Sequence, residues 1–291
     1  MTRPCPGPVS PRAPKLKAPL GACDSHQHVF GPYGLFPLND DRSYTPPEAP
    51  LAAYQSVMRT LGLQRAAIVH GSAHGLDIRA TVHAVEALGK NGRGVAVLPP
   101  TVKHVELDRL NTSGIRGTRV VTKVRGGVDP GASQALAKRI ARLGWHLQLL
   151  IDGPTEMESI APLLRELPVP FVIDAIGGFR PQDGVNHPGF KVLLKLLESG
   201  RGWVKLIGAE RRTRTGAPAF ADVSPLARAV IETRPDRVLW GTDWPHVMAW
   251  TYPVPDDADL LDGLLQMDAS DAQRQAILVD NPVALYGFDA S

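Results

Sequence analysis

The feature that most constrains the fold is a series of eight short apolar runs, separated by segments with helical patterns. The runs are rich in β-branched residues, and several of them, such as AAIVH, GVAVL, LQLLI and FVIDAI, are apolar without alternation. This pattern is typical of strands that are covered on both faces in a parallel sheet. We expect strands at residues 22–29, 65–71, 94–98, 117–122, 146–151, 170–176, 202–207 and 237–243.

The segments between these runs have the length and pattern of helices. PLAAYQSVMRTLG begins with a proline suited to a first helical turn and ends at Gly62, and ASQALAKRIARLG ends at Gly144. Strands that alternate with helices in this number predict a closed (β/α)8 barrel. The alternative is a doubly wound sheet, which usually has a glycine-rich phosphate loop after its first strand, whereas this first strand ends in histidines. We predict one barrel domain over residues 23–291.

Composition excludes several classes of protein. With 43% hydrophobic and 21% charged residues, and no apolar run near the ~18 residues that cross a bilayer, the chain reads as a soluble globular protein without a membrane partner. The net charge of +3 is too small to indicate a nucleic-acid-binding protein. Cys5 and Cys23 are too few for a disulfide framework, so a cytoplasmic location is expected.

Residues 1–22 differ from the rest of the chain. They carry six prolines and four basic residues, and they lack the apolar centre of a secretory signal. We predict an extended N-terminal arm. Two alternatives stay open for it, a disordered tail and an arm packed on the barrel.

Histidines and an acid lie at the carboxyl ends of the first and last predicted strands. His26 and His28 in CDSHQHVFG are two residues apart, so on a strand both point to the same face. Asp243, in LWGTDWPH, is the final residue of the last predicted strand. These strands are neighbours in a closed barrel, so we expect the two imidazoles and the carboxylate to meet at its mouth. Such a group can take a proton from water and stabilise an oxyanion, as ester hydrolysis requires.

Arginines in or after the fourth and seventh strands are candidates to bind a substrate carboxylate, because the planar guanidinium suits bidentate binding. The candidates are Arg119, Arg125, Arg211 and Arg212, and we expect only one of Arg211, Arg212 and Arg214 to face the cleft. The alternative for Arg125 is a solvated loop charge. The predicted substrate-binding set is completed by Ser72, His246 and Tyr44. Lys205 is either a site residue or part of a structural ion pair, and His70 and His74 are expected behind the site or at its rim.

Five motifs occur in order along the chain: CDSHQHVFG, IVHGSAHGLD, IRGTRVVTKVR, WVKLIGAERR and LWGTDWPH. Together they resemble the amidohydrolase superfamily, and within it the branch of 2-pyrone-4,6-dicarboxylate lactonase. The resemblance implies a hydrolase that opens a small carboxylated lactone of the pyrone dicarboxylate or muconolactone type. It also implies that Asp243 takes a proton from the attacking water and that His26 and His28 belong to the catalytic group. The residues that it implies as substrate contacts are Arg119, Arg125, Arg211 and Ser72.

The chain departs from this family after the sixth strand. Ala175 stands where the family has a histidine, which in the lactonase branch polarises the scissile carbonyl, and Leu150 and Gly178 replace a tyrosine and an arginine of that branch. Three explanations of Ala175 stay open: an engineered His→Ala change, a natural variant with another substrate, and a binding protein that has lost its chemistry. We expect slow turnover.

The lactonase branch works without a metal, so we expect no cofactor. If a metal binds, zinc or manganese at His26, His28 and Asp243 is the expected form, because catalytic zinc sites use three protein ligands plus water. Two other functions stay open, a metal-dependent hydrolase or decarboxylase and a non-catalytic dicarboxylate-binding protein. The sequence makes no prediction about oligomeric state.

Overall fold

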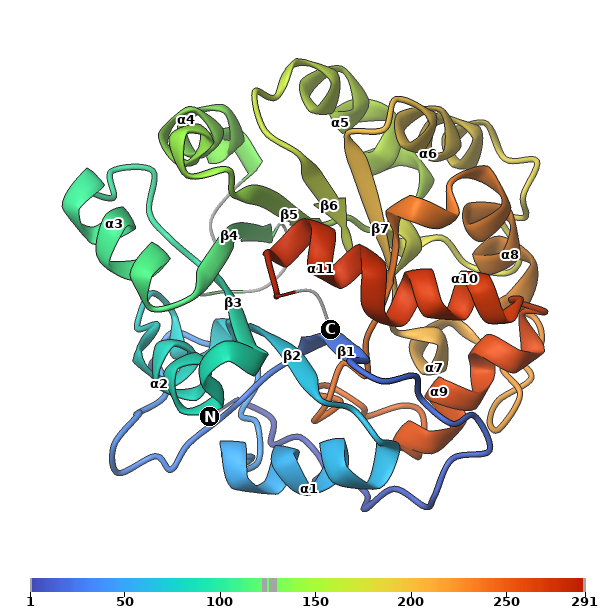
Figure 1. Ribbon diagram of the computed structural model, residues 1–291, viewed down its shortest axis with the longest axis horizontal. Coiled ribbons are helices and arrows are strands. Elements are labelled where there is room, and N and C mark those ends of the chain that lie inside the picture. Colours follow the sequence, from blue (N-terminus) through green and yellow to red (C-terminus); the bar gives the residue numbers. More distant parts are fainter. Residues whose placement is uncertain (1, 122–124, 126–129, 290–291) are drawn as a thin grey trace.

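Eight parallel strands form a ring with the helices around it (Figure 1). The computed structural model describes residues 2–121, 125 and 130–289. The strands pair in chain order, and they are β1 Cys23–Gln27, β2 Arg65–Val69, β3 Gly92–Ala96, β4 Ile115–Val121, β5 His146–Leu150, β6 Phe171–Ile173, β7 Gly202–Leu206 and β8 Val238–Trp240. Backbone hydrogen bonds from Asp243 N to His26 O and from His28 N to Trp244 O, both 2.8 Å, connect the two ends of the series. The predicted (β/α)8 barrel is confirmed.

Helices follow every strand of the ring. They are α1 Leu51–Leu61, α2 Arg79–Leu88, α3 His104–Thr112, α4 Ser133–Ile140, α5 Pro154–Glu166, α6 Pro188–Glu198, α7 Ala209–Arg212, α8 Ser224–Thr233, α9 Asp257–Gln266, α10 Asp271–Gln275 and α11 Asn281–Tyr286. Helix α1 ends as predicted, because Gly62 adopts φ 76° and its N–H donates to Arg59 O. No helix in the described part of the chain is long and apolar enough to span a membrane.

Strands β6 and β8 each end three residues earlier than predicted, the largest such differences, and both matter for the site. After β6 the chain turns at once, because Ala175 and Ile176 both adopt φ 52° in the left-handed region. After β8, the absence of a side chain at Gly241 lets the backbone pack closely against β1. A Cβ at this position would lie 2.7 Å from the backbone nitrogen of His26. Residues 174–176 and 241–243 therefore lie in turns at the mouth of the barrel rather than in strands.

The other end of the barrel is covered by the C-terminal segment. Figure 1 shows α11 lying across the ring of strands. Tyr286 of α11 is buried there, with its ring centre 5.5 Å from that of His146, the first residue of β5, and its hydroxyl 3.3 Å from Ser25 O. The end of the barrel at which the strands begin is thus filled with side chains, which leaves the carboxyl ends of the strands to form a cavity.

The N-terminal arm is packed on the barrel. Pro4 forms a β-bridge with Thr45, Arg12 pairs with Asp262 at 2.8 Å, and the backbone nitrogen of Leu16 donates to the same aspartate at 2.8 Å. Only 6% of Leu16 is exposed. Of the two alternatives for the arm, these contacts favour the packed one for residues 2–22.

Truncating the buried leucine of the arm tests this packing. Leu16→Ala is expected to lower the free energy of unfolding by about 2 kcal/mol, because a buried leucine loses both its transfer free energy and its contacts. Leu20→Ala is the matched control, since 75% of Leu20 is exposed, and it is expected to change little. Denaturant unfolding of both variants measures the difference, and equal values would show that the arm does not contribute to stability.

Candidate active site

A cavity of about 270 Å³ lies at the carboxyl ends of the strands. Seven of the predicted site residues line it: His26, His28, Tyr44, Ser72, Arg119, Arg211 and Asp243. The other lining residues are mostly apolar and include Leu150, Ile151, Ala175 and Val247. A group of polar side chains thus faces a largely apolar wall, the usual composition of a site for a small molecule.

The two histidines and Asp243 lie within contact distance of one another. His28 Nε2 is 3.3 Å from Asp243 Oδ1, and His26 Nε2 is 3.7 Å from the same oxygen. The imidazole rings are perpendicular, with centres 5.1 Å apart. The structure therefore brings His26 and His28, near the start of the chain, together with Asp243, near its end.

Arg211 holds the second oxygen of the Asp243 carboxylate. Its Nε and Nη2 donate to Asp243 Oδ2 at 3.1 and 2.8 Å, which leaves Oδ1 facing the imidazoles. Burial would raise the pKa of Asp243, but the charge of Arg211 and the contact with His28 outweigh burial, so the pKa lies well below its usual range. Asp243 is therefore a carboxylate at neutral pH.

His26 is oriented from behind by Asp174. Its Nδ1 is 3.3 Å from Asp174 Oδ1, while Asp174 Oδ2 accepts from Arg119 Nε at 3.1 Å and from Gln148 Nε2 at 3.1 Å. Complete burial outweighs the nearby carboxylate and lowers the pKa of His26 to about 3, so the ring is neutral. A proton on Nδ1 facing Asp174 leaves the lone pair of Nε2 directed at the cavity.

His28 is oriented by a backbone carbonyl. Its Nδ1 lies 2.8 Å from Val69 O, and because a carbonyl only accepts, Nδ1 carries a proton. The other ring nitrogen, Nε2, faces Asp243 Oδ1. Both histidines thus present Nε2 to the same carboxylate oxygen.

The arginines differ in whether a protein carboxylate already neutralises them. Arg119 pairs with Asp174 at 3.0 Å and Arg211 with Asp243 at 2.8 Å. Arg212 also lines the cavity, and its one hydrogen bond among the described residues runs from Nη1 to Gly208 O at 3.1 Å, in its own turn. Arg212 is therefore the arginine of this cavity with no carboxylate partner in the described part of the chain.

Comparison with known proteins agrees with this arrangement. A family model described as amidohydrolase matches residues 23–288. The chain belongs to the amidohydrolase family. A 4-sulfomuconolactone hydrolase of Rhizobium radiobacter is 37% identical, over 98% of this chain and 96% of the relative. A 2-pyrone-4,6-dicarboxylate hydrolase of Comamonas testosteroni is 36% identical, over 96% of this chain and 94% of the relative. The crystal structure of an Agrobacterium tumefaciens protein in its apo state is 29% identical and superimposes with a TM-score of 0.86, over 97% of this chain and 99% of that one.

The central group of this amidohydrolase fits a divalent cation. One ligand atom each from His26, His28 and Asp243 lie within 4.8 Å of one another, and His26 Nε2 is buried without a hydrogen-bond partner among the described residues. Two imidazoles and one carboxylate are a ligand set that catalytic zinc accepts, with water completing the shell. A site of the right composition is therefore present, and the expectation that no metal is required stays a prediction.

The structure places two predicted substrate contacts of this amidohydrolase outside the lining of the cavity. Arg125 does not line the cavity: 70% of its side chain is exposed, and it pairs with Asp41 at 3.2 Å. His246 is fully buried, and its Nε2 is 2.9 Å from Asp257 of α9. The turn after β8, in which His246 adopts φ 60°, directs this imidazole to α9 instead of the cavity. Sequence position alone did not reveal the conformation of either loop.

A third prediction, that only one arginine after β7 faces the cleft, is also wrong. Arg211 and Arg212 both line the cavity, because they are consecutive residues of the short helix α7, which lies at its edge. Arg214 is exposed, and its backbone nitrogen donates to Asp222 at 2.7 Å. The cluster of arginines was visible in the sequence, but the orientation of each one was not.

The remaining candidates have structural partners. Tyr44 and Ser72 line the cavity, and their hydroxyl groups are 3.2 Å apart. Lys205 is buried inside the barrel, where Nζ donates to Ser25 O at 2.7 Å and to Gln148 Oε1 at 2.8 Å, and burial lowers its pKa to about 8. His70 is also buried behind the cavity, and Nε2 contacts Gly75 O at 2.8 Å. Lys205 Nζ and Gln148 Nε2 lie 3.4 and 3.5 Å from His26 Nδ1, so both side chains contact His26 from the barrel interior, a role for Gln148 that sequence reasoning missed.

Proposed function

We propose that this amidohydrolase opens a small carboxylated lactone by attack of water on the ring carbonyl. The observation that carries the proposal is the meeting of Asp243 Oδ1 with the Nε2 atoms of His26 and His28 beside a mostly apolar cavity. The two hydrolases that it resembles along nearly their whole length act on lactones, by their names. Action in the cytoplasm, without nucleic-acid or membrane partners, remains part of this proposal.

Each side chain of the central group has a role in the proposed reaction. Asp243 Oδ1 takes a proton from water, and the resulting hydroxide adds to the carbonyl carbon. His26 Nε2, an acceptor, orients that water, and His28 donates to the oxyanion when Nε2 carries a proton. The bond from the carbonyl carbon to the ring oxygen then breaks, and Asp243 returns its proton to the leaving oxygen. The product is a carboxylic acid with a free hydroxyl or enol group, and the acid releases the second proton of the water to solvent.

The arginines bind the acid group of the substrate in this proposal. Arg212 is the first candidate, since it has no carboxylate partner among the described residues to compete with the substrate. Arg211 is held by Asp243, so a substrate acid that draws Arg211 away would raise the pKa of Asp243 and make it a stronger base. Binding of an anionic substrate and activation of the base are thereby coupled.

Removing the charge of Arg212 tests its assignment. Arg212→Met is expected to lower kcat/KM for a carboxylated lactone about 10- to 100-fold, because charge-assisted hydrogen bonds contribute about 1.5–3 kcal/mol. The loss should fall mainly on KM. Arg214→Met is the matched control, since Arg214 is exposed and lies outside the cavity lining, and it should not change kcat/KM. Equal values for the two variants would show that Arg212 does not bind the acid group.

Metal removal tests the expectation that no cofactor is required. A zinc or manganese ion held by His26, His28 and Asp243 would act as a Lewis acid on the carbonyl or lower the pKa of bound water. The expected result is that exhaustive dialysis against a chelator leaves the rate unchanged and that added zinc or manganese does not raise it. A loss on chelation that either metal restores would assign these three residues as ligands instead.

The substrate class is tested with the purified protein and two lactones, 2-pyrone-4,6-dicarboxylate and 4-sulfomuconolactone. The expected result is ring opening of at least one of them. Loss of lactone absorbance measures the rate, and mass spectrometry identifies the acid product. Release of carbon dioxide would indicate a decarboxylase. Binding in a thermal-shift assay without turnover, also in the Ala175→His variant, would indicate a binding protein.

A further inference from the structure

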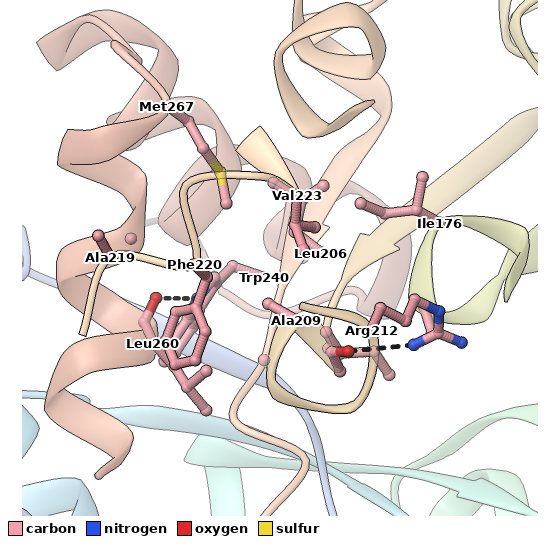
Figure 2. Close-up of a pocket in the computed structure, with 15 residues that line it drawn as sticks. Ile176, Leu206, Ala209, Arg212, Ala219, Phe220, Val223, Trp240, Leu260 and Met267 are labelled. Carbon is pink, nitrogen blue, oxygen red and sulfur yellow. Dashed lines mark hydrogen bonds between the residues drawn. The ribbon is translucent and has the colours of Figure 1, made fainter. Parts of the chain in front are cut away.

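A second cavity, of about 30 Å³, lies beside the active-site cavity between the ends of β7 and β8 and helix α9. We call it the side chamber. Figure 2 shows that its walls are almost entirely apolar, with Leu206, Phe220, Val223, Trp240 and Met267 around the space. The indole nitrogen of Trp240 donates to Leu260 O at 3.2 Å, so this polar group of the wall is already satisfied. Little in the chamber would therefore bind water.

The side chamber and the active-site cavity share four lining residues, Ala175, Ile207, Gly208 and Arg212. The partition is thin where Ala175 and Gly208 meet, because one contributes a methyl group and the other no side chain. A Cβ placed on Gly208 would lie 3.7 Å from the Cβ of Ala175 and 2.8 Å from Nη1 of Arg212. A substrate acid held by Arg212 would thus bring the adjoining carbon of the substrate to this partition.

Arg212 is the one charged residue among the described residues that line the chamber. In Figure 2 its guanidinium lies at the border of the chamber, where it donates to Gly208 O. A ligand that reaches both cavities must therefore be anionic at the border and apolar beyond it. The volume corresponds to about two water-sized groups, which is room for one or two carbon atoms.

We propose that the side chamber receives a short alkyl substituent of the substrate, so that this enzyme prefers lactone acids alkylated next to the acid group. This inference rests on the proposed function and names its substrate class more narrowly. Entry of a methyl group replaces empty space with contacts and removes apolar surface from water, which is worth about fourfold in kcat/KM per carbon. Groups larger than the chamber should bind less well than hydrogen.

The test compares 2-pyrone carboxylates that carry hydrogen, methyl or phenyl on the ring carbon next to the acid group. The methyl compound is expected to have a kcat/KM about fourfold above that of the hydrogen compound, and the phenyl compound a lower one. Val223→Ile, which adds one carbon to the chamber wall, should remove the methyl preference, measured as the ratio of kcat/KM for the methyl compound to kcat/KM for the hydrogen compound. Val230→Ile is the control, because Val230 is equally buried in α8 but does not line the chamber.

Equal rates for the hydrogen and methyl compounds, or a preference that survives in Val223→Ile, would overturn the inference. If Val223→Ile does not fold, Gly263→Ala replaces it, since a Cβ on Gly263 would meet Met267 Cε at an ordinary 3.9 Å. If no lactone is opened, the proposed function fails, and the chamber is then tested separately. Crystals under xenon should show the gas in the chamber of the unsubstituted protein and not in Val223→Ile; an empty chamber in both would reject it as a binding space.

Discussion

Replacing Asp243 with asparagine is expected to slow lactone opening by about 10²–10⁴-fold, the usual contribution of a general base. The amide oxygen can still accept a hydrogen bond from Arg211, but it does not take a proton from water at neutral pH. An amide NH₂ group at the position of Oδ1, 3.3 Å from His28 Nε2, would also remove the acceptor that faces the imidazoles. The loss should appear in kcat, measured with the lactone that the unsubstituted enzyme opens fastest.

Asp268→Asn is the matched control for this experiment. Its side chain is 74% exposed, pairs with Arg228 at the surface and does not line the cavity. Like Asp243, it adopts a positive φ, here 52°, which asparagine tolerates well. Its rate should equal that of the unsubstituted enzyme. An Asp243→Asn variant that is as active as the control would remove the proposed base.

Replacing Ala175 with histidine is expected to raise the rate of lactone opening at least tenfold, and up to about 10²–10³-fold if the imidazole acts as an oxyanion donor. Ala175 lines the cavity, which at about 270 Å³ has room for the ring. Its backbone, at φ 52° and ψ 43°, is in the left-handed region, where histidine is found more often than most residues. Steady-state kinetics on the same lactone measure the gain.

Ala53→His is the control, because Ala53 is an exposed residue of α1 and a histidine there should not alter the rate. A gain confined to Ala175→His would indicate that a carbonyl-polarising group is missing in this chain. No gain on any lactone would count against that role and favour a natural variant suited to another substrate. The same substitution also thickens the partition to the side chamber, so the preference for methylated lactones should fall as the rate rises.

The fold could be predicted because the apolar runs and the helical segments alternate along the whole chain. Runs such as AAIVH and LQLLI lie in β2 and β5, where both faces of the sheet are covered. The ends of β6 and β8 could not be predicted in this way. There the chain leaves the sheet through left-handed residues such as Ala175 and Asp243, and apolar periodicity contains no information about a positive φ.

The same reason explains which parts of the site were predicted. His26, His28 and Asp243 lie at or just beyond the carboxyl ends of strands that neighbour one another in any closed barrel, so topology alone places them together. Arg212 and His246 lie on a short helix and a turn, where local backbone conformation decides whether a side chain faces the cavity. Residue type identified the chemistry of these positions, but their orientation required the structure.

The most direct test of the central claim is to carry out the reaction in ¹⁸O-labelled water and analyse the product of a single turnover by mass spectrometry. Attack of water on the ring carbonyl, with Asp243 as the base, predicts one labelled oxygen, located in the new carboxylate. An unlabelled product would show that the ring is rearranged rather than hydrolysed, and label on the hydroxyl carbon would show attack at the other end of the ester bond. Either result would contradict the mechanism that we assign to this cavity.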